Sequence, residues 1–471
     1  MNNTLLIPFF KNPVFWTELF HIASILGFVL GIVLITQILR NPRKPSATIG
    51  WLLIIILVPL VGIPLYLTFG DRKFNKLKKQ KGTLDLPVCL NTNTHSINNL
   101  MVAMGLPSST DYNQNKFHAD GKQAWQELVI LLESAQQTID IAIFILADDN
   151  IGNKILSLLE KKAAQGVRVR LLLDGVGSLT LPKKQVQLLI ENGGEVAWFI
   201  PVLHLPFRGR TNLRNHRKIV IVDKKNVWTG GRNFAEEYLG EKCLEDCWVD
   251  LSSSQSGQVV EVYHYIFTAD WNFATNKEVK IDLKFKKQVN RGKKQIQIIP
   301  SGPDVDDDPI YVAILNACYL ARQSITIITP YFVPNTGLQE ALKLAALRGV
   351  KINLIVPEKS NHRLADIARR RYIRELHKVG VNIWLVPNKM VHAKALVFDD
   401  DFAMAGSANL DIRSLFLNCE VMSAYYSKED IQWLTNWLEL LCKESNQYQP
   451  PPESILGEML EGIVLLAAYQ L

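Results

Sequence analysis

One arrangement of chemically active residues occurs twice in this sequence. Residues 216–223 and residues 392–399 both follow the spacing His-x-Lys-x4-Asp. The six motif residues are His216, Lys218, Asp223, His392, Lys394 and Asp399. A lone His-x-Lys pair on a strand is usually a surface pair, whereas two equally spaced copies with similar Gly/Asn sequels indicate a catalytic site.

The two motifs together suit a two-step transfer of a phosphoryl group. One histidine attacks phosphorus and forms a phosphohistidine, while the other protonates the leaving alcohol and later deprotonates the incoming one. The two lysines, helped by the side chains of Asn233, Ser407 and Asn409, form an anion site for the phosphate. Because these groups stabilise the charge, the scheme needs no metal ion and no other cofactor.

Each histidine also needs a carboxylate that fixes its tautomer. Asp250 follows His216 by 34 residues and Glu420 follows His392 by 28 residues, both within strand-like runs. We therefore expect each acid to orient the histidine of its own half. The two motif aspartates end their strands, so we expect structural hydrogen bonds from them and no direct chemistry.

The motifs must be positioned by two similar α/β units. Four apolar residues separate each motif lysine from its aspartate, which predicts a buried strand with His and Lys on one face. Helices at 124–136 and 310–322 precede strands at 138–144 and 324–330. In each unit a second helix then ends at a glycine, Gly166 or Gly349, just before another strand. The predicted fold is therefore α/β, with two α/β/α halves related by pseudo-two-fold symmetry.

The N-terminal region differs from this body. Residues 19–39 and residues 49–69 are runs of 21 residues without a formal charge. Each is long enough to cross a bilayer of about 30 Å, which predicts a transmembrane hairpin with helices at about 17–39 and 48–69. A signal peptide and a buried core helix are the alternatives. The lack of a cleavage site argues against the first, and the length of the second run argues against the other.

The remaining boundaries follow from composition. Residues 71–115 form a basic juxtamembrane segment and a linker, the first half spans 116–294, and the second half spans 295–445. An insertion at 202–215 precedes the first motif. The tail, 446–471, has apolar residues at helical spacing and lies either in the membrane interface or against the core.

Positive charge is concentrated beside the hairpin. Residues 40–82 hold nine Lys/Arg and one acid, a balance of +8 against +7 for the whole chain, so the body is close to neutral. This distribution argues against a nucleic-acid partner. The segment after the hairpin is richer in Lys/Arg than the turn within it, which places the body on the cytoplasmic side. The sequence identifies no protein partner.

The double motif, with the sequels Gly-Gly-Arg-Asn233 and Gly-Ser-Ala-Asn409, resembles the phospholipase D superfamily. From about residue 20 to the C-terminus the chain is similar to the bacterial cardiolipin synthases of that superfamily. The similarity is carried by residues 45–66, by Thr-Pro-Tyr-Phe-Val-Pro at 329–334 and by residues 409–420.

This resemblance implies phosphatidyl transfer between two phosphatidylglycerol molecules at a bacterial cell membrane, with release of glycerol. It also implies a phosphatidyl-histidine intermediate and no metal. The first-half sequel departs from Gly-Ser-x-Asn. We interpret Arg232 as replacing a hydroxyl, so that this half binds phosphate differently, and we predict His216 as the nucleophile. The alternatives are a membrane-tethered hydrolytic phospholipase D, a nuclease of the same superfamily and a non-enzymatic scaffold. The two intact motifs argue against the scaffold.

Overall fold

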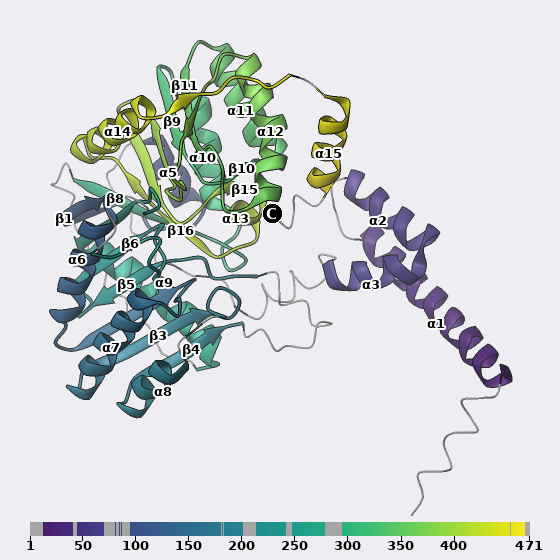
Figure 1. Cartoon of the computed structure of the whole chain (residues 1–471), viewed down its shortest axis with the longest axis horizontal. Helices are drawn as coiled ribbons and strands as arrows, with labels where there is room; N and C mark the ends of the chain where they lie inside the picture. Colours follow the sequence, from purple (N-terminus) through teal and green to yellow (C-terminus); the bar gives the residue numbers. More distant parts are fainter. Residues whose placement is uncertain are drawn as a thin grey trace, which may run out of the picture. The chain divides into compact units, whose positions relative to one another are not determined.

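The computed structural model describes residues 13–40, 45–69, 81, 84, 86, 95–179, 181, 183–200, 213–241, 247–277, 294–452 and 454–466. The chain divides into two units (Figure 1). One comprises residues 1–80 and 203–211, and the other comprises residues 81–202 and 212–471.

The first unit consists of three helices, α1 (Pro13–Arg40), α2 (Pro45–Leu57) and α3 (Pro59–Phe69). They pack around a small apolar cluster formed by Leu34, Ile38, Ile55, Ile63 and Tyr66. The predicted second helix is thus two helices, because Pro59 has no N–H for the carbonyl of Ile55 and its ring hinders a regular turn. None of the helices in the described part of the chain combines the length and the apolarity needed to span a membrane.

The first half of the second unit is a seven-stranded sheet covered by helices. Its strands, in the order β1-β7-β6-β5-β2-β3-β4, are β1 (Thr110–His118), β7 (Ser252–Gly257), β6 (Asn226–Gly230), β5 (Ile219–Val222), β2 (Thr138–Ile143), β3 (Arg168–Asp174) and β4 (Glu195–Phe199). Helices α6 (Gly121–Glu133), α7 (Asn150–Ala164) and α8 (Lys183–Glu191) lie on one face and α9 (Val259–Thr275) lies on the other (Figure 1).

The second half repeats this plan. Its strands run β8-β16-β14-β13-β9-β11-β12, namely β8 (Gln295–Ser301), β16 (Glu420–Tyr425), β14 (Phe402–Gly406), β13 (Ala395–Phe398), β9 (Ser324–Ile328), β11 (Lys351–Pro357) and β12 (Asn382–Val386). Helices α10 (Pro309–Leu320), α11 (Thr336–Leu347) and α12 (Arg363–Lys378) lie opposite α14 (Lys428–Lys443) (Figure 1). The short strand β17 (Asn446–Gln447) extends the outer edge. The predicted α/β fold with two repeated halves is confirmed.

The second half also contains a short two-stranded ribbon and a short helix. A two-stranded ribbon joins β10 (Phe332–Val333) to β15 (Leu410–Asp411), and the short helix α13 (Ile412–Phe416) follows directly. Strands β8 and β1 pair antiparallel, so the two sheets form one continuous 15-stranded sheet.

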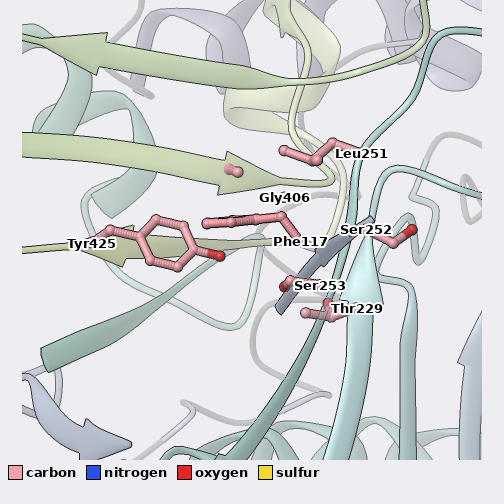
Figure 2. A pocket seen from close by; sticks show the side chains of 9 residues that line it. Phe117, Thr229, Leu251, Ser252, Ser253, Gly406 and Tyr425 are labelled. Atoms are coloured by element: carbon pink, nitrogen blue, oxygen red, sulfur yellow. The ribbon is translucent and has the colours of Figure 1, made fainter. Parts of the chain in front are cut away.

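The seam between the halves is polar and closely packed. Gln255 of β7 donates a hydrogen bond to Ser423 of β16 over 3.2 Å, and the hydroxyls of Ser423 and Tyr263 lie 2.7 Å apart. A cavity of about 10 Å³ remains at this seam, which leaves room for about one water molecule. Figure 2 shows that strands of both halves line it, with Phe117, Thr229 and Tyr425 among the lining residues.

Several local predictions are confirmed, and one boundary differs. Gly166 and Gly349 follow α7 and α11 with φ values of +86° and +89°, the left-handed conformation that ends a helix. The body, however, begins before the predicted residue 116. The segment expected to be a linker contains α5 (Ser96–Ala103) and the first residues of β1.

The C-terminal helix α15 (Ile455–Leu466) packs on the body, as one of the two alternatives for the tail predicted. Glu461 forms a two-bond ion pair with Arg374 of α12, at 2.7 and 3.0 Å, and Val464 is buried. Ile455 and Leu456 on the same helix are 80% and 78% exposed. One face of α15 therefore packs on the body and another presents apolar side chains to the surroundings.

The two motif aspartates bind the backbone, as expected. Asp223 accepts hydrogen bonds from the backbone N–H groups of residues 136, 137 and 138 over 2.7–2.9 Å, at the start of β2. Asp399 accepts from residues 322, 323 and 324 over 2.8–2.9 Å, at the start of β9. Each carboxylate thus fixes the motif strand against its central neighbour in the sheet.

We predict that Asp399→Asn destabilises the body by about 1 kcal/mol, because an amide nitrogen then faces a backbone N–H that has lost its acceptor. Asparagine keeps the left-handed backbone of this position, where φ is +51°. Denaturant unfolding in detergent measures the change, with Asp400→Asn at the exposed neighbouring acid as the control. Equal stability of both variants would contradict the assignment.

Candidate active site

Each motif strand enters the site beside a segment from the opposite half. The N–H of His216 donates to the carbonyl of Cys419 over 2.9 Å. The N–H of Cys419 in turn donates to the carbonyl of Arg214 over 2.9 Å. In the second half, the N–H of His392 donates to the carbonyl of Val249 over 2.7 Å. Because Glu420 and Asp250 directly follow Cys419 and Val249, backbone pairing brings each acid to a histidine of the other half.

His216 is oriented by groups of the second half. Its Nδ1 lies 3.0 Å from Oε2 of Glu420 and 3.1 Å from the carbonyl oxygen of Ser407. The Ser407 hydroxyl donates to the same Glu420 oxygen over 2.5 Å, and the Phe144 ring stands edge-on to the imidazole. With Nδ1–H donating to the carboxylate, Nε2 carries the lone pair and is the atom able to attack or to accept a proton.

His392 has a matching environment built from the first half. Its Nδ1 lies 2.7 Å from Oδ2 of Asp250. The rings of Tyr238 and Trp248 lie against the imidazole, with centroid distances of 4.9 and 5.7 Å. This carboxylate also orients Nδ1–H and leaves Nε2 free of a proton, so both histidines are held in the same tautomer.

The predicted acids are therefore the right residues with the wrong partners. We expected Asp250 to orient His216 and Glu420 to orient His392, because each acid follows that histidine in the chain. The structure pairs Asp250 with His392 and Glu420 with His216. Strand pairing between the halves, which distance along the sequence does not report, decides the partner.

The two lysines lie in the same environment as the histidines and are fully buried. Each donates to the backbone carbonyl of its motif histidine, Lys218 over 2.8 Å to His216 and Lys394 to His392. Burial lowers the pKa of Lys394 to about 8 against the pull of nearby carboxylates. Burial lowers the pKa of Lys218 well below its usual value. The charge of Glu420 opposes this shift, and the charge of Lys394 adds to it.

The charges of the two motifs act on each other, so they belong to one site. Burial lowers the pKa of His216 to about 4, and the charges of Lys218 and Lys394 contribute. Burial also lowers the pKa of His392 to about 3, again with contributions from both lysines. Asp250 stays ionised, because the charges around it outweigh its burial and hold its pKa at about 2. Both imidazoles are therefore neutral near pH 7.

The other predicted residues surround this centre in different ways. The hydroxyl of Ser407 connects Glu420 to the backbone N–H of Val421, which lies 3.0 Å away. Asn233 Oδ1 accepts from the N–H of Ile145 over 3.3 Å, and Asn409 is buried in the equivalent place of the second half. All three lie in the sequels that directly follow β6 and β14.

The interpretation of Arg232 was wrong. Its buried guanidinium donates to the backbone carbonyls of His118, Ala119 and Tyr238, so these donors stabilise the fold. The equivalent strands end at Gly230 and Gly406, so Gly231 is the residue that stands where the second half has Ser407. A Cβ atom on Gly231 would lie 2.2 Å from Oδ1 of Asp250. A side chain there is excluded by the carboxylate that orients His392.

The sequence analysis missed the residues that fix the backbone on either side of His216. Arg217, the variable residue of the first motif, is fully buried and binds both carboxylate oxygens of Asp270 over 2.8 and 3.0 Å. Asn215 donates to the same carboxylate over 2.9 Å. The only sequence signal was the difference between Arg217 and Ala393, a charged and a small residue at equivalent places. Within the described residues, no group of three or more His, Cys, Asp or Glu side chains is arranged to hold a metal ion.

Two buried imidazoles with unprotonated Nε2 atoms, one of them 3.1 Å from the Lys394 ammonium, lie with two buried lysines in an arrangement that suits phosphoryl transfer through histidine. A family model described as "Cardiolipin synthase, PLD-like domain" matches residues 128–271 and 314–442. A second one, "Phospholipase_D-nuclease N-terminal", matches residues 29–70. The chain belongs to the PLD-like cardiolipin synthase family.

Individual proteins agree with this assignment. The chain is 34% identical over 425 residues to "Major cardiolipin synthase ClsA" of Bacillus subtilis, a match that covers 85% of this chain and 88% of that protein. It is 33% identical over 467 residues to "Cardiolipin synthase" of Listeria monocytogenes, covering 91% and 95%. The crystal structure of phosphatidylserine synthase from Haemophilus influenzae has the same fold, with a TM-score of 0.59, 14% identity and coverage of 84% and 100%.

Proposed function

We propose that this enzyme transfers a phosphatidyl group from one phosphatidylglycerol molecule to the hydroxyl of another, giving cardiolipin and glycerol. The observation that carries the proposal is the pair of buried imidazoles, each held by a carboxylate of the other half. Membership of the PLD-like cardiolipin synthase family supports the choice of lipid. In the proposed mechanism only amino-acid side chains act on the phosphate.

In the first step Nε2 of one histidine attacks phosphorus. The phosphorus–oxygen bond to the headgroup glycerol breaks, and the phosphatidyl group stays on the histidine. As the negatively charged phosphate diester binds, the other imidazole takes up a proton from solvent at Nε2. It then gives this proton to the departing glycerol oxygen, so that a neutral alcohol leaves. In the second step the same histidine takes the proton from the hydroxyl of a second phosphatidylglycerol, which attacks the phosphatidyl-histidine. The charges of Lys218 and Lys394 stabilise the phosphate oxygens in both steps. All bonds are exchanged one for one, so the reaction is reversible.

We assign His216 as the nucleophile. Its neighbours Asn215 and Arg217 are both bound to Asp270, so the backbone on either side of the imidazole is fixed. His392 lies between Val391 and Ala393, which have no charged partner. An attacking atom benefits most from a fixed position, because rate depends steeply on the attack geometry.

We also propose that the N-terminal unit anchors the enzyme in the bacterial cell membrane as a helical hairpin, with the catalytic body on the cytoplasmic side. Large apolar side chains on its helices are exposed, among them Phe28 (70%), Leu57 (72%) and Leu60 (86%). Such side chains favour a hydrocarbon environment. The exposed apolar face of α15 would add a contact at the membrane interface.

The main test supplies purified enzyme with phosphatidylglycerol in mixed micelles. We expect equimolar glycerol and cardiolipin, and a loss of at least about 10³-fold in turnover for both His216→Ala and His392→Ala. His377→Ala, which removes a histidine of α12 outside the site, is the control and keeps turnover. Phosphatidic acid without cardiolipin would mean that water is the acceptor and would contradict the proposal.

The role of each histidine can be separated with a phosphatidyl ester of p-nitrophenol, whose leaving group needs no proton. We expect His392→Ala to release a burst of about one nitrophenolate per enzyme, because His216 still attacks. We expect His216→Ala to give no burst. The reverse pattern would show that His392 is the nucleophile.

Membrane placement is tested by protease treatment of sealed inside-out and right-side-out vesicles that contain the enzyme. Because the basic segment follows the hairpin, we expect cleavage of the catalytic body in inside-out vesicles only. Cleavage in right-side-out vesicles alone would reverse the orientation. Release of the intact enzyme by alkaline carbonate would contradict membrane anchoring.

A further inference from the structure

A group of four buried charges lies beneath the first motif. Asp270 of α9 and Asp304, just after β8, supply two carboxylates, while Arg217 and Lys81 supply two cations. Arg217 and Asp270 are fully buried and Asp304 is 1% exposed. The side chain of Lys81 is 4% exposed. The group is therefore sealed from water and balanced in charge.

This group determines the position of the residues on both sides of His216. Asp270 binds the guanidinium of Arg217 and the amide of Asn215. Arg217 also donates from Nε to the carbonyl of Glu420 over 3.1 Å and from Nη2 to the carbonyl of Ser301 over 3.2 Å. The same guanidinium thus connects the first motif to the acid that orients His216.

Lys81 reaches this group from outside the two repeated halves. It is the first residue of the catalytic unit after the N-terminal helices. Its Nζ lies 2.5 Å from Oδ1 of Asp270 and 2.9 Å from Oδ2 of Asp304. The backbone N–H of Leu84 donates to the carbonyl of Asp304 over 2.8 Å, and the side chains of Leu84 and Leu86 are buried. The segment is thereby attached to the body at several points.

Charge balance gives Lys81 its importance. Without its ammonium, two carboxylates would share one guanidinium in a medium of low dielectric constant, and a buried unpaired charge is strongly unfavourable. The carboxylates would then separate or take up a proton, and either change weakens the bonds to Arg217 and Asn215. Burial alone would lower the pKa of Lys81, but the two carboxylates outweigh it and keep the side chain charged.

We propose that Lys81 is a positioning residue for the transfer reaction. It completes the charge group that fixes residues 215–217, so the geometry of His216 depends on the segment that joins the body to the N-terminal helices. This inference rests on the proposed function, because position matters through attack by His216. It assigns a task in the reaction to one lysine of a segment whose composition indicates only a basic linker.

The test compares three variants in the micelle assay and in the nitrophenol burst. Lys81→Met removes the charge and keeps an apolar stem. Lys81→Arg keeps the charge. The double variant Lys81→Met/Asp304→Asn removes one charge of each sign and restores the balance. Lys225→Met, which removes an exposed lysine after β5, is the control and keeps wild-type kinetics.

We expect Lys81→Met to lower kcat by about 10- to 100-fold, the effect of a small displacement of a reacting group, with KM changed less than about twofold. The double variant should recover at least about tenfold of this loss, and Lys81→Arg should stay within about fivefold of the wild type. A role in stability alone would change the unfolding midpoint and leave kcat per folded molecule unchanged. That result, or a double variant no more active than Lys81→Met, would overturn the proposal.

Two further comparisons keep the result decisive. If Lys81→Met does not fold, Asp304→Asn alone leaves the group with excess positive charge, so the double variant should be more active than it. A double variant less active than Asp304→Asn would overturn the proposal. A wild-type enzyme that releases nitrophenol and makes no cardiolipin would refute the assigned acceptor, while the burst rates of the variants would still decide the role of Lys81.

Discussion

The exchange of carboxylates between the halves is the constraint on which the rest of the site depends. A histidine can act through Nε2 only when its Nδ1 proton has a fixed acceptor, and here each acceptor belongs to the opposite half. Backbone bonds from residues 216 and 392 to the facing segments place the acids within reach. Neither half therefore holds a histidine together with its carboxylate, and the hydrogen bond between Gln255 of β7 and Ser423 of β16 also joins the two halves.

Burial makes this arrangement effective on a phosphate. Two lysines and two ionised acids lie in a volume without bulk water, where charges interact several times more strongly than in solution. Burial lowers the pKa of Lys394 to about 8. An incoming phosphate diester, which is negatively charged, favours the protonated form of both lysines and so strengthens its own binding site. Both imidazoles are neutral before the diester arrives, and its negative charge also favours the protonation of the imidazole that acts as the acid.

Local features of the site could be predicted from the sequence, and features that depend on docking could not. The four apolar residues of each motif predicted β5 and β13, and the motif aspartates were predicted to bind backbone, because strand periodicity acts over a few residues. Asp250 and Glu420 were identified, but their partners were reversed, since the spacing along the chain does not report which strands meet. Asp270 gave no signal, because an acid on the helix α9 has no pattern that distinguishes it from a surface residue.

The two halves share a fold, but they are not equivalent in chemistry. In the second half Ser407 donates to Glu420, whereas in the first half the Asp250 carboxylate itself occupies the place that a side chain of residue 231 would take. Arg217 of the first motif belongs to the buried charge group that it forms with Asp270, Asp304 and Lys81. The second motif has Ala393 in place of the arginine. A nucleophile must keep one position through both steps, whereas an acid–base group must follow two different alcohols. In the proposed mechanism the first half therefore supplies attack through His216 and the second half supplies proton transfer through His392.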